Sequence, residues 1–322
     1  MAIWYLQLTI TKTVNSVTSI PIDPLTIIEL TNLKAAGKLT DLAKHPSLAI
    51  KPEWIEELAQ HQDFNVREAL AKNPALGESS VAMSALAQDS SEYVRAYLAG
   101  NPAIRTAPEV VERSASANRA FIRAWLARNP ALASYPLVAK RLSKDRSKRV
   151  RCNLADNPAL ANFPEIVATL ASDEDYEVRW YLAQNPALMH LADVINQLAN
   201  DDLWPVRATL ARNPALAEFP DIVAKLTADE SSWVRDALAR NPAIADFPDV
   251  IKELSKDESE SVRFWLAYNQ AIVNLPEIAD RLAKDESEEV REALSRNLAI
   301  PASTTSPQPW PTQPTTQKAP TI

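Results

Sequence analysis

One pattern of apolar and polar residues recurs along most of the chain with a spacing of 28 residues. Each copy has valine or isoleucine followed by arginine, then leucine three residues later and asparagine three residues after that. Valine and leucine four residues apart share one helix face, so every copy predicts an amphipathic helix. The nine arginines that mark the copies are Arg67, Arg95, Arg123, Arg151, Arg179, Arg207, Arg235, Arg263 and Arg291.

Proline has two fixed places in the same period. It follows the asparagine in seven of the nine copies, and this ends the helix because the residue before proline is pushed out of the α region. A second series of prolines precedes an apolar anchor by six residues and predicts the first turn of another helix. Residues 248–257 and 259–269 are thus expected to form two helices joined by a short acidic turn.

A single helix pair cannot bury its apolar face, so neighbouring pairs must stack. With an eroded tenth copy at residues 39–48, the pattern predicts an all-α solenoid of about ten 28-residue helix-turn-helix repeats over residues 25–300. Residues 3–14 alternate polar with apolar, so residues 1–24 are expected to form a strand-like cap or, alternatively, a dimerising edge strand. The Pro/Thr-rich residues 301–322 are expected to be disordered.

The repeated arginine lies on the side of its helix that packs against the neighbouring helices. A buried guanidinium group needs a hydrogen-bonding or oppositely charged partner there. Aspartate stands six residues before it in seven of nine copies, with His61 and Ala117 as the exceptions. We therefore predict an Asp–Arg ladder with each pair inside one repeat. The repeated asparagines, which both donate and accept hydrogen bonds, are expected to form a parallel ladder that holds the turn backbone.

The Asp-x5-Arg spacing followed by leucine is similar to short HEAT repeats. The string VRDALARNPAI…FPDVIKELSKDESESVR also resembles the leucine-rich repeat variant family, over about residues 39–300. The resemblance implies an α-solenoid and specifies no activity. The second proline falls seven residues after the asparagine, farther than in that family, which implies a longer first helix closer to HEAT geometry. Some members of that family hold an iron–sulfur cluster on several cysteines, but this chain has only Cys152, so we expect no cofactor.

Aromatic residues occupy positions of the second helix that vary between repeats. Such residues are typical of interface anchors, although they also fill grooves between layers. Trp204 and Tyr176 stand at the border of these positions. The predicted partner-binding aromatics are Tyr93, Tyr97, Phe121, Trp125, Trp180, Tyr181, Trp233 and Trp265, with Phe264 beside them.

Charge is unevenly distributed in a chain of net charge −7. Residues 113–151 hold eleven Lys or Arg and one acid, whereas residues 156–300 hold 27 acids and 13 bases. The basic run, with Lys148 and Arg149, predicts contact with an acidic protein surface, a phosphate or nucleic acid, and a merely solvated face is the alternative.

Little in the sequence indicates catalysis. Three glycines cannot form a glycine-rich phosphate loop, and His45, His61 and His190 fall in different repeats without matched acids or nucleophiles. No apolar run is long enough to cross a membrane, and the first residues do not resemble a signal peptide. We expect a cytoplasmic, non-enzymatic scaffold that binds a protein or peptide. Nucleic-acid binding is the alternative, which the acidic C-terminal half opposes.

Overall fold

The computed structural model describes residues 24–188 and 191–298, and all regular structure within them is α-helix or 3₁₀-helix. The predicted cap lies outside the described residues except for Pro24, which begins the first helix, and the predicted tail lies outside them too. The chain forms two compact units, Met1–Val110 and Val111–Ile322, whose boundary falls within α7 (Pro108–Ala115). The all-α repeat architecture predicted from the 28-residue period is confirmed.

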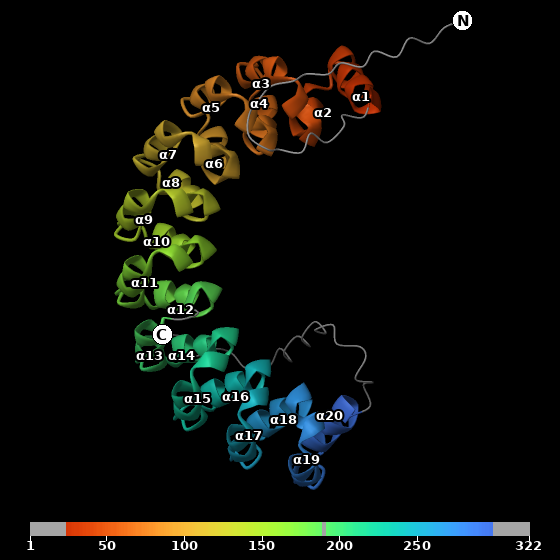
Figure 1. Cartoon of the computed structure of the whole chain (residues 1–322), viewed down its shortest axis with the longest axis vertical. Coiled ribbons are helices and arrows are strands. Elements are labelled where there is room, and N and C mark those ends of the chain that lie inside the picture. Colours follow the sequence, from red (N-terminus) through yellow and green to blue (C-terminus); the bar gives the residue numbers. More distant parts are fainter. Residues whose placement is uncertain (1–23, 189–190, 299–322) are drawn as a thin grey trace, which may run out of the picture. The chain divides into compact units, whose positions relative to one another are not determined.

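Within its described residues, unit 1 contains three helix pairs with a 3₁₀-helix after each of the second helices. Figure 1 labels its helices α1 to α6. Its helices are α1 (Pro24–Ala35), α2 (Leu39–Lys44), α3 (Pro52–Ala59), α4 (Phe64–Ala71), α5 (Ser80–Leu86) and α6 (Glu92–Gly100). Its 3₁₀-helices are η1 (Pro46–Ile50), η2 (Pro74–Glu78) and η3 (Pro102–Thr106). The eroded tenth copy is therefore a real repeat, formed by α2 and η1.

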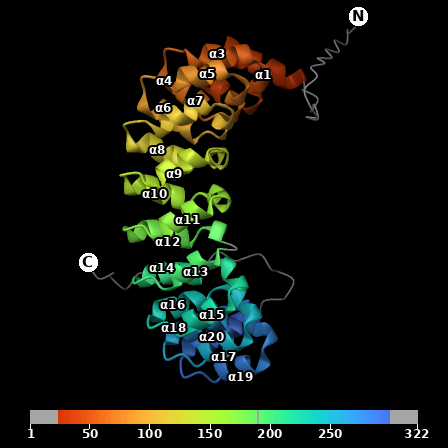
Figure 2. The same cartoon turned by 60° about the vertical axis from the view of Figure 1, so that its left-hand side comes forward.

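Unit 2 repeats the same arrangement from α7 onward, with the first helices in one row and the second helices in another (Figures 1 and 2). The first-helix row is α9 (Pro136–Leu142), α11 (Pro164–Ala171), α13 (Ala192–Ala199), α15 (Pro220–Thr227), α17 (Pro248–Leu254) and α19 (Pro276–Leu282). The second-helix row is α8 (Ala120–Ala127), α10 (Lys148–Ala155), α12 (Tyr176–Ala183), α14 (Trp204–Ala211), α16 (Ser232–Ala239), α18 (Glu260–Tyr268) and α20 (Glu288–Leu298). The 3₁₀-helices are η4 (Pro130–Ser134), η5 (Pro158–Asn162), η6 (Pro186–Leu188), η7 (Pro214–Glu218), η8 (Pro242–Asp246) and η9 (Gln270–Asn274).

The core of unit 2 is a seam between the two rows. Ile166, Val167 and Leu170 of α11 are buried, as are Val178 and Leu182 of α12. Each second helix also packs on the second helix of the next repeat, as α10 does on α12. Burying one such aliphatic side chain contributes about 1.5–3 kcal/mol, so stacking stabilises each pair that could not fold alone.

The prediction of a longer first helix is wrong. From α3 to α19 the first helices have seven or eight residues. The extra residues between the asparagine and the second proline form a 3₁₀-helix instead. In the turn after α6, Pro102 begins η3 and Pro108 then begins α7. The two prolines therefore start two separate helices, each supplied with the fixed φ that a first turn accepts.

Candidate partner-binding surface

The repeated asparagines hold each turn to the turn before it. Asn213 Nδ2 donates to the carbonyls of Ala183 and Asn185 at 2.8 and 3.2 Å, and its Oδ1 accepts from the N–H of Ala215 at 2.9 Å. Asn213 is only 2% exposed, so these bonds satisfy backbone groups that water does not reach. The predicted asparagine ladder is confirmed, and these residues belong to the scaffold.

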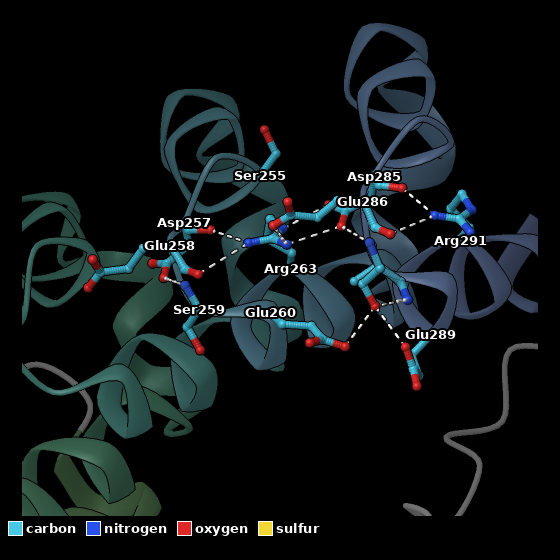
Figure 3. A network of polar contacts seen from close by, with 12 residues as sticks. Ser255, Asp257, Glu258, Ser259, Glu260, Arg263, Asp285, Glu286, Glu289 and Arg291 are labelled. Carbon is cyan, nitrogen blue, oxygen red and sulfur yellow. Dashed lines mark hydrogen bonds and ion pairs between the residues drawn. The ribbon is translucent and has the colours of Figure 1, made fainter.

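The arginine ladder exists, but its carboxylate partner comes from the next repeat. Arg207 Nε and Nη2 contact Asp229 Oδ2 and Oδ1 at 2.7 and 2.9 Å, whereas its Nη1 donates to the backbone carbonyl of Asp201 at 2.7 Å. Asp201, six residues upstream, was the predicted carboxylate partner. Figure 3 shows the same geometry for Arg263, which lies between Asp257 of its own repeat and Asp285 of the following one.

This shift by one repeat changes which copies lack a partner. Arg67 and Arg123, predicted to be unpaired, contact Asp89 and Asp145. Twenty-two residues after Arg95 stands Ala117, which has no carboxylate. Among the described residues, Arg95 keeps only bonds from Nη1 to the carbonyls of Asp89 and Ser90.

The ladder also sets the protonation of its members. Burial alone would raise the pKa of Asp145, but its hydrogen bonds from Arg123 and from the Ser147 N–H, together with the arginine charge, hold that pKa below the ordinary value. Asp285 has a lowered pKa for the same reasons, with Arg263 and Ser287 as donors. The hydrogen bond to Asp229 raises the pKa of Arg207. The Arg123–Asp145 and Arg263–Asp285 pairs are therefore ionised at neutral pH.

The predicted binding residues differ in exposure. Among the aromatics, Tyr93 in unit 1 and Trp125 and Trp233 in unit 2 are exposed. Tyr97, Phe121, Trp180 and Tyr181 are half-buried. The half-buried rings contact their own neighbours: Lys72 Nζ lies 3.7 Å from the Tyr97 ring centre, and the Trp180 and Tyr181 rings meet edge to face at 4.9 Å.

Trp265 is not part of an exposed surface, which corrects the prediction. It is 8% exposed and lies beneath the guanidinium of Arg240, whose carbon is 3.6 Å from the ring centre. Arg240 is held in place by Asp236 at 2.8 Å, and Asp236 accepts a further bond from Ser261 Oγ at 3.0 Å. This polar cover joins α16 to α18 and makes Trp265 a packing residue. Burial raises the pKa of Asp236 against the opposing effect of Arg240.

Two exposed aromatics from adjacent repeats meet in unit 2. Trp204 at the start of α14 and Trp233 in the first turn of α16 stack with ring centres 5.8 Å apart and planes 22° apart. They are 45% and 44% exposed. Leu203, next to Trp204, and Tyr176, one period before Trp204, are exposed as well. In the sequence, Trp204 and Tyr176 stand only at the border of the variable positions. The signal that could have found them is their shared place two residues before the valine of each helix.

Several residues of the basic run already form ion pairs within the protein. Arg123 and Arg151 belong to the ladder. Lys148 contacts Asp175 and Glu177 of the next repeat at 3.4 and 3.1 Å, and Arg149 lies over the Phe121 ring at 5.7 Å. Arg128 and Arg141 pair with acids as well. Both predicted basic site residues are exposed, but the run is not an uncompensated cationic patch.

Residues able to perform chemistry serve local structure. The Nδ1 atoms of His45 and His61 accept from the N–H groups of Ser47 and Asp63, whereas His190 lies outside the described residues. Cys152 is buried, and desolvation raises the pKa of its thiol to about 11. Within residues 24–188 and 191–298 no cluster of His, Cys, Asp and Glu could hold a metal ion, and no helix is long and apolar enough to cross a membrane.

Stacked helix pairs with a polar ladder between successive repeats define an α-solenoid repeat protein. No protein-family model matches the chain, and no curated protein matches it in sequence. It is similar to a solved structure described as a leucine-rich repeat variant with a novel repetitive protein structural motif, at 21% identity and a TM-score of 0.47. The match covers 74% of this chain and 88% of the other.

Proposed function

We propose that the protein is a non-enzymatic scaffold that binds a protein or peptide through exposed aromatic side chains of its second helices. The observation that carries this proposal is the exposed stack of Trp204 and Trp233. The core positions of the same helices are already filled by buried Val206, Leu210 and Val234, so the indoles are not needed to close the seam. Aromatic anchors of this kind dominate binding energy when a partner covers them.

The basic run has a second role in this proposal. Arg113, Lys140, Lys144 and Arg146 are exposed, and none has an ion-pair partner within the described residues. Charges at the rim of an interface steer association and set orientation more than they add affinity. We therefore assign to this run the orientation of a partner with a complementary acidic region, and we place the scaffold in the cytoplasm.

A peptide-display selection on the full chain tests the scaffold function. Wild-type protein is expected to enrich a defined set of sequences that the Trp204→Ala/Trp233→Ala variant does not retain. Leu137→Ala is the matched control because Leu137 is 81% exposed on α9, in the other helix row. The control should retain the wild-type set. Identical selections with the double variant, or no enrichment with wild type, would contradict the proposal.

A further inference from the structure

Unit 2 carries exposed large hydrophobic side chains at the N-terminal ends of three successive second helices. We define the aromatic patch as Tyr176 of α12, Leu203 and Trp204 at the start of α14, and Trp233 of α16. All four are at least 40% exposed. The two indoles stack on each other.

A row of carboxylates runs along the loops that lead into the same helix ends. Each loop has one exposed residue directly after the ladder position, which is aspartate in most copies and His61 and Ala117 in two of them. In the first four complete loops these exposed residues are Gln62, Ser90, Asn118 and Arg146. From α12 onward all five are acidic, and we call them the acidic row: Glu174, Asp202, Glu230, Glu258 and Glu286. Asp202 and Glu230 stand two and three residues before the stacked tryptophans.

The acidic row is not required by the ladder. Glu230 Oε1 approaches Arg207 Nη2 at 3.3 Å, but that arginine already binds Asp229 through two nitrogens, and the Glu230 side chain remains 87% exposed. Glu258 approaches Arg235 and Glu286 approaches Arg263 in the same way, and these glutamate side chains are 89% and 88% exposed. Figure 3 shows Glu286 beside Arg263. Exposed pairs of this kind contribute little to stability.

The loops that lead into the second helices from α12 to α20 carry an excess of acids. Fifteen acids and no lysine or arginine occur in segments 173–178, 201–206, 229–234, 257–262 and 285–290. One ladder arginine neutralises one aspartate in each of these segments, and Lys148 reaches only the first of them. The carboxylates of the acidic row remain in excess beside two exposed indoles.

We propose that the aromatic patch and the acidic row together bind a lysine- or arginine-rich extended segment of a partner protein. This inference rests on the proposed scaffold function and names the chemistry of its partner. An indole face is the best aromatic surface for a cation, and a carboxylate within the same reach provides a charge-assisted hydrogen bond. A neutral segment that covers the tryptophans would desolvate the carboxylates without giving them a partner. An acidic segment would be repelled by the carboxylates.

The spacing of the repeats predicts the spacing of the bound cations. Helices pack roughly 8–10 Å apart, which sets the step from one carboxylate of the acidic row to the next. A polyproline II segment rises about 3.1 Å per residue, so every third residue advances by nearly the same step. The preferred ligand thus carries lysine or arginine at every third position.

Three synthetic peptides of equal length test this inference by fluorescence anisotropy on the full chain. The first has lysine at every third position with proline and alanine between, the second has the same composition with the lysines contiguous, and the third has glutamate in place of lysine. We expect the first to bind, the second to bind about fivefold more weakly, and the third not to bind. Equal binding of the first two would overturn the spacing, and preference for the glutamate peptide would overturn the cationic partner.

Variants locate the binding. Trp204→Ala/Trp233→Ala should weaken the first peptide about tenfold or more. Asp202→Asn/Glu230→Gln/Glu258→Gln should weaken it about tenfold at low salt and flatten the salt dependence. Asp221→Asn/Asp246→Asn/Asp249→Asn removes equal charge from exposed acids outside the acidic row and should retain affinity within about twofold.

The outcomes separate the two proposals. Equal losses in the two acid triples would show only general charge attraction and overturn the site. If displayed sequences without basic residues require Trp204 and Trp233, the cationic partner is wrong and the scaffold function stands. If neither the peptides nor the displayed sequences depend on these tryptophans, both proposals fail.

Discussion

Each ladder arginine with an aspartate in the next repeat uses all parts of its guanidinium group. In Arg235 the Nε and Nη2 atoms grip Asp257 at 2.6 and 3.0 Å, while Nη1 donates to the carbonyl of Asp229 at 2.7 Å. Lysine cannot reproduce this planar fork. One side chain thereby fixes the loop of its own repeat and the carboxylate of its neighbour.

Removing a ladder arginine should lower the free energy of unfolding most where an aspartate is left buried without a partner. Arg207→Ala, Arg179→Ala and Arg67→Ala are each expected to lower the unfolding free energy by about 3 kcal/mol or more. Arg95→Ala should cost clearly less, because Ala117 stands where its carboxylate would be. Urea denaturation of the four variants measures this order. A loss at Arg95 equal to that at Arg207 would refute the shifted ladder.

The ladder also predicts sensitivity to acid. The pKa of Asp145 is held below its unfolded value of 3.8, so the ionised carboxylate stabilises the folded state above that pH. This contribution is lost as the pH falls through the lower, folded pKa. Wild type should lose stability between about pH 5 and pH 2, and Asp145→Asn should lose less over that range while being less stable at pH 7. Denaturation at several pH values, with exposed Asp221→Asn as control, provides the comparison. Parallel curves for wild type and Asp145→Asn would exclude this carboxylate as a source of the acid sensitivity.

Trp265 and Trp233 should respond oppositely to truncation. Trp265→Ala removes a buried ring under Arg240 and is expected to lower stability by about 3–5 kcal/mol. Trp233→Ala removes a ring that is 44% exposed and should have a much smaller effect on the melting temperature. Thermal melts of the two variants measure the difference. Similar losses of stability in the two variants would mean that Trp233 is also a packing residue.

The sequence shows the arginines and aspartates of the ladder, but it does not show which aspartate pairs with which arginine. Positions six before and 22 after each arginine are the same place in the 28-residue period, so both predict aspartate equally well. Which one supplies the carboxylate depends on how the repeats stack, which no single repeat encodes. The burial of Trp265 is similar, since it depends on Arg240 from the preceding repeat.

At the scale of the element, the helices and their starts follow from local sequence. The predicted helices at 248–257 and 259–269 appear as α17 and α18, each ending within a few residues of the expected position. The sequence does not predict the 3₁₀-helix, because a proline after asparagine indicates the end of a helix as readily as the start of one. The asparagine before that proline accepts from the N–H two residues later, as Asn241 does from Ala243, and this starts a new helix.

The hydrogen bonds of the repeated asparagines should therefore contribute as much to stability as the burial of a core side chain. Asn213→Ala leaves the buried carbonyls of Ala183 and Asn185 without their donor and is expected to cost about 3 kcal/mol. Asn162→Ala is the matched control, because the exposed Asn162 bonds only within its own turn. Urea denaturation distinguishes them, and equal small losses would contradict a structural role for the asparagine ladder.

At the scale of the whole molecule, stability is a sum over neighbouring repeats. Deleting residues 270–322 removes η9, α19 and α20, and with them the Asp285 that binds Arg263. The unfolding free energy should fall in a modest step while the remaining repeats still unfold cooperatively. Circular dichroism during denaturation tests this. Complete unfolding of the shortened chain would show that the last repeat is indispensable.

The sequence distances from a ladder arginine to its two partners have a consequence for how the gene can change in length. The arginine extends back six residues to a carbonyl and forward 22 to a carboxylate, and together these distances in sequence equal one repeat. A duplicated copy of 28 residues placed in the run from α8 to α20 would find a donor before it and an acceptor after it without any compensating mutation. A gene for such a chain can lengthen or shorten by whole copies, and a copy of any other length would break the bonds on both sides.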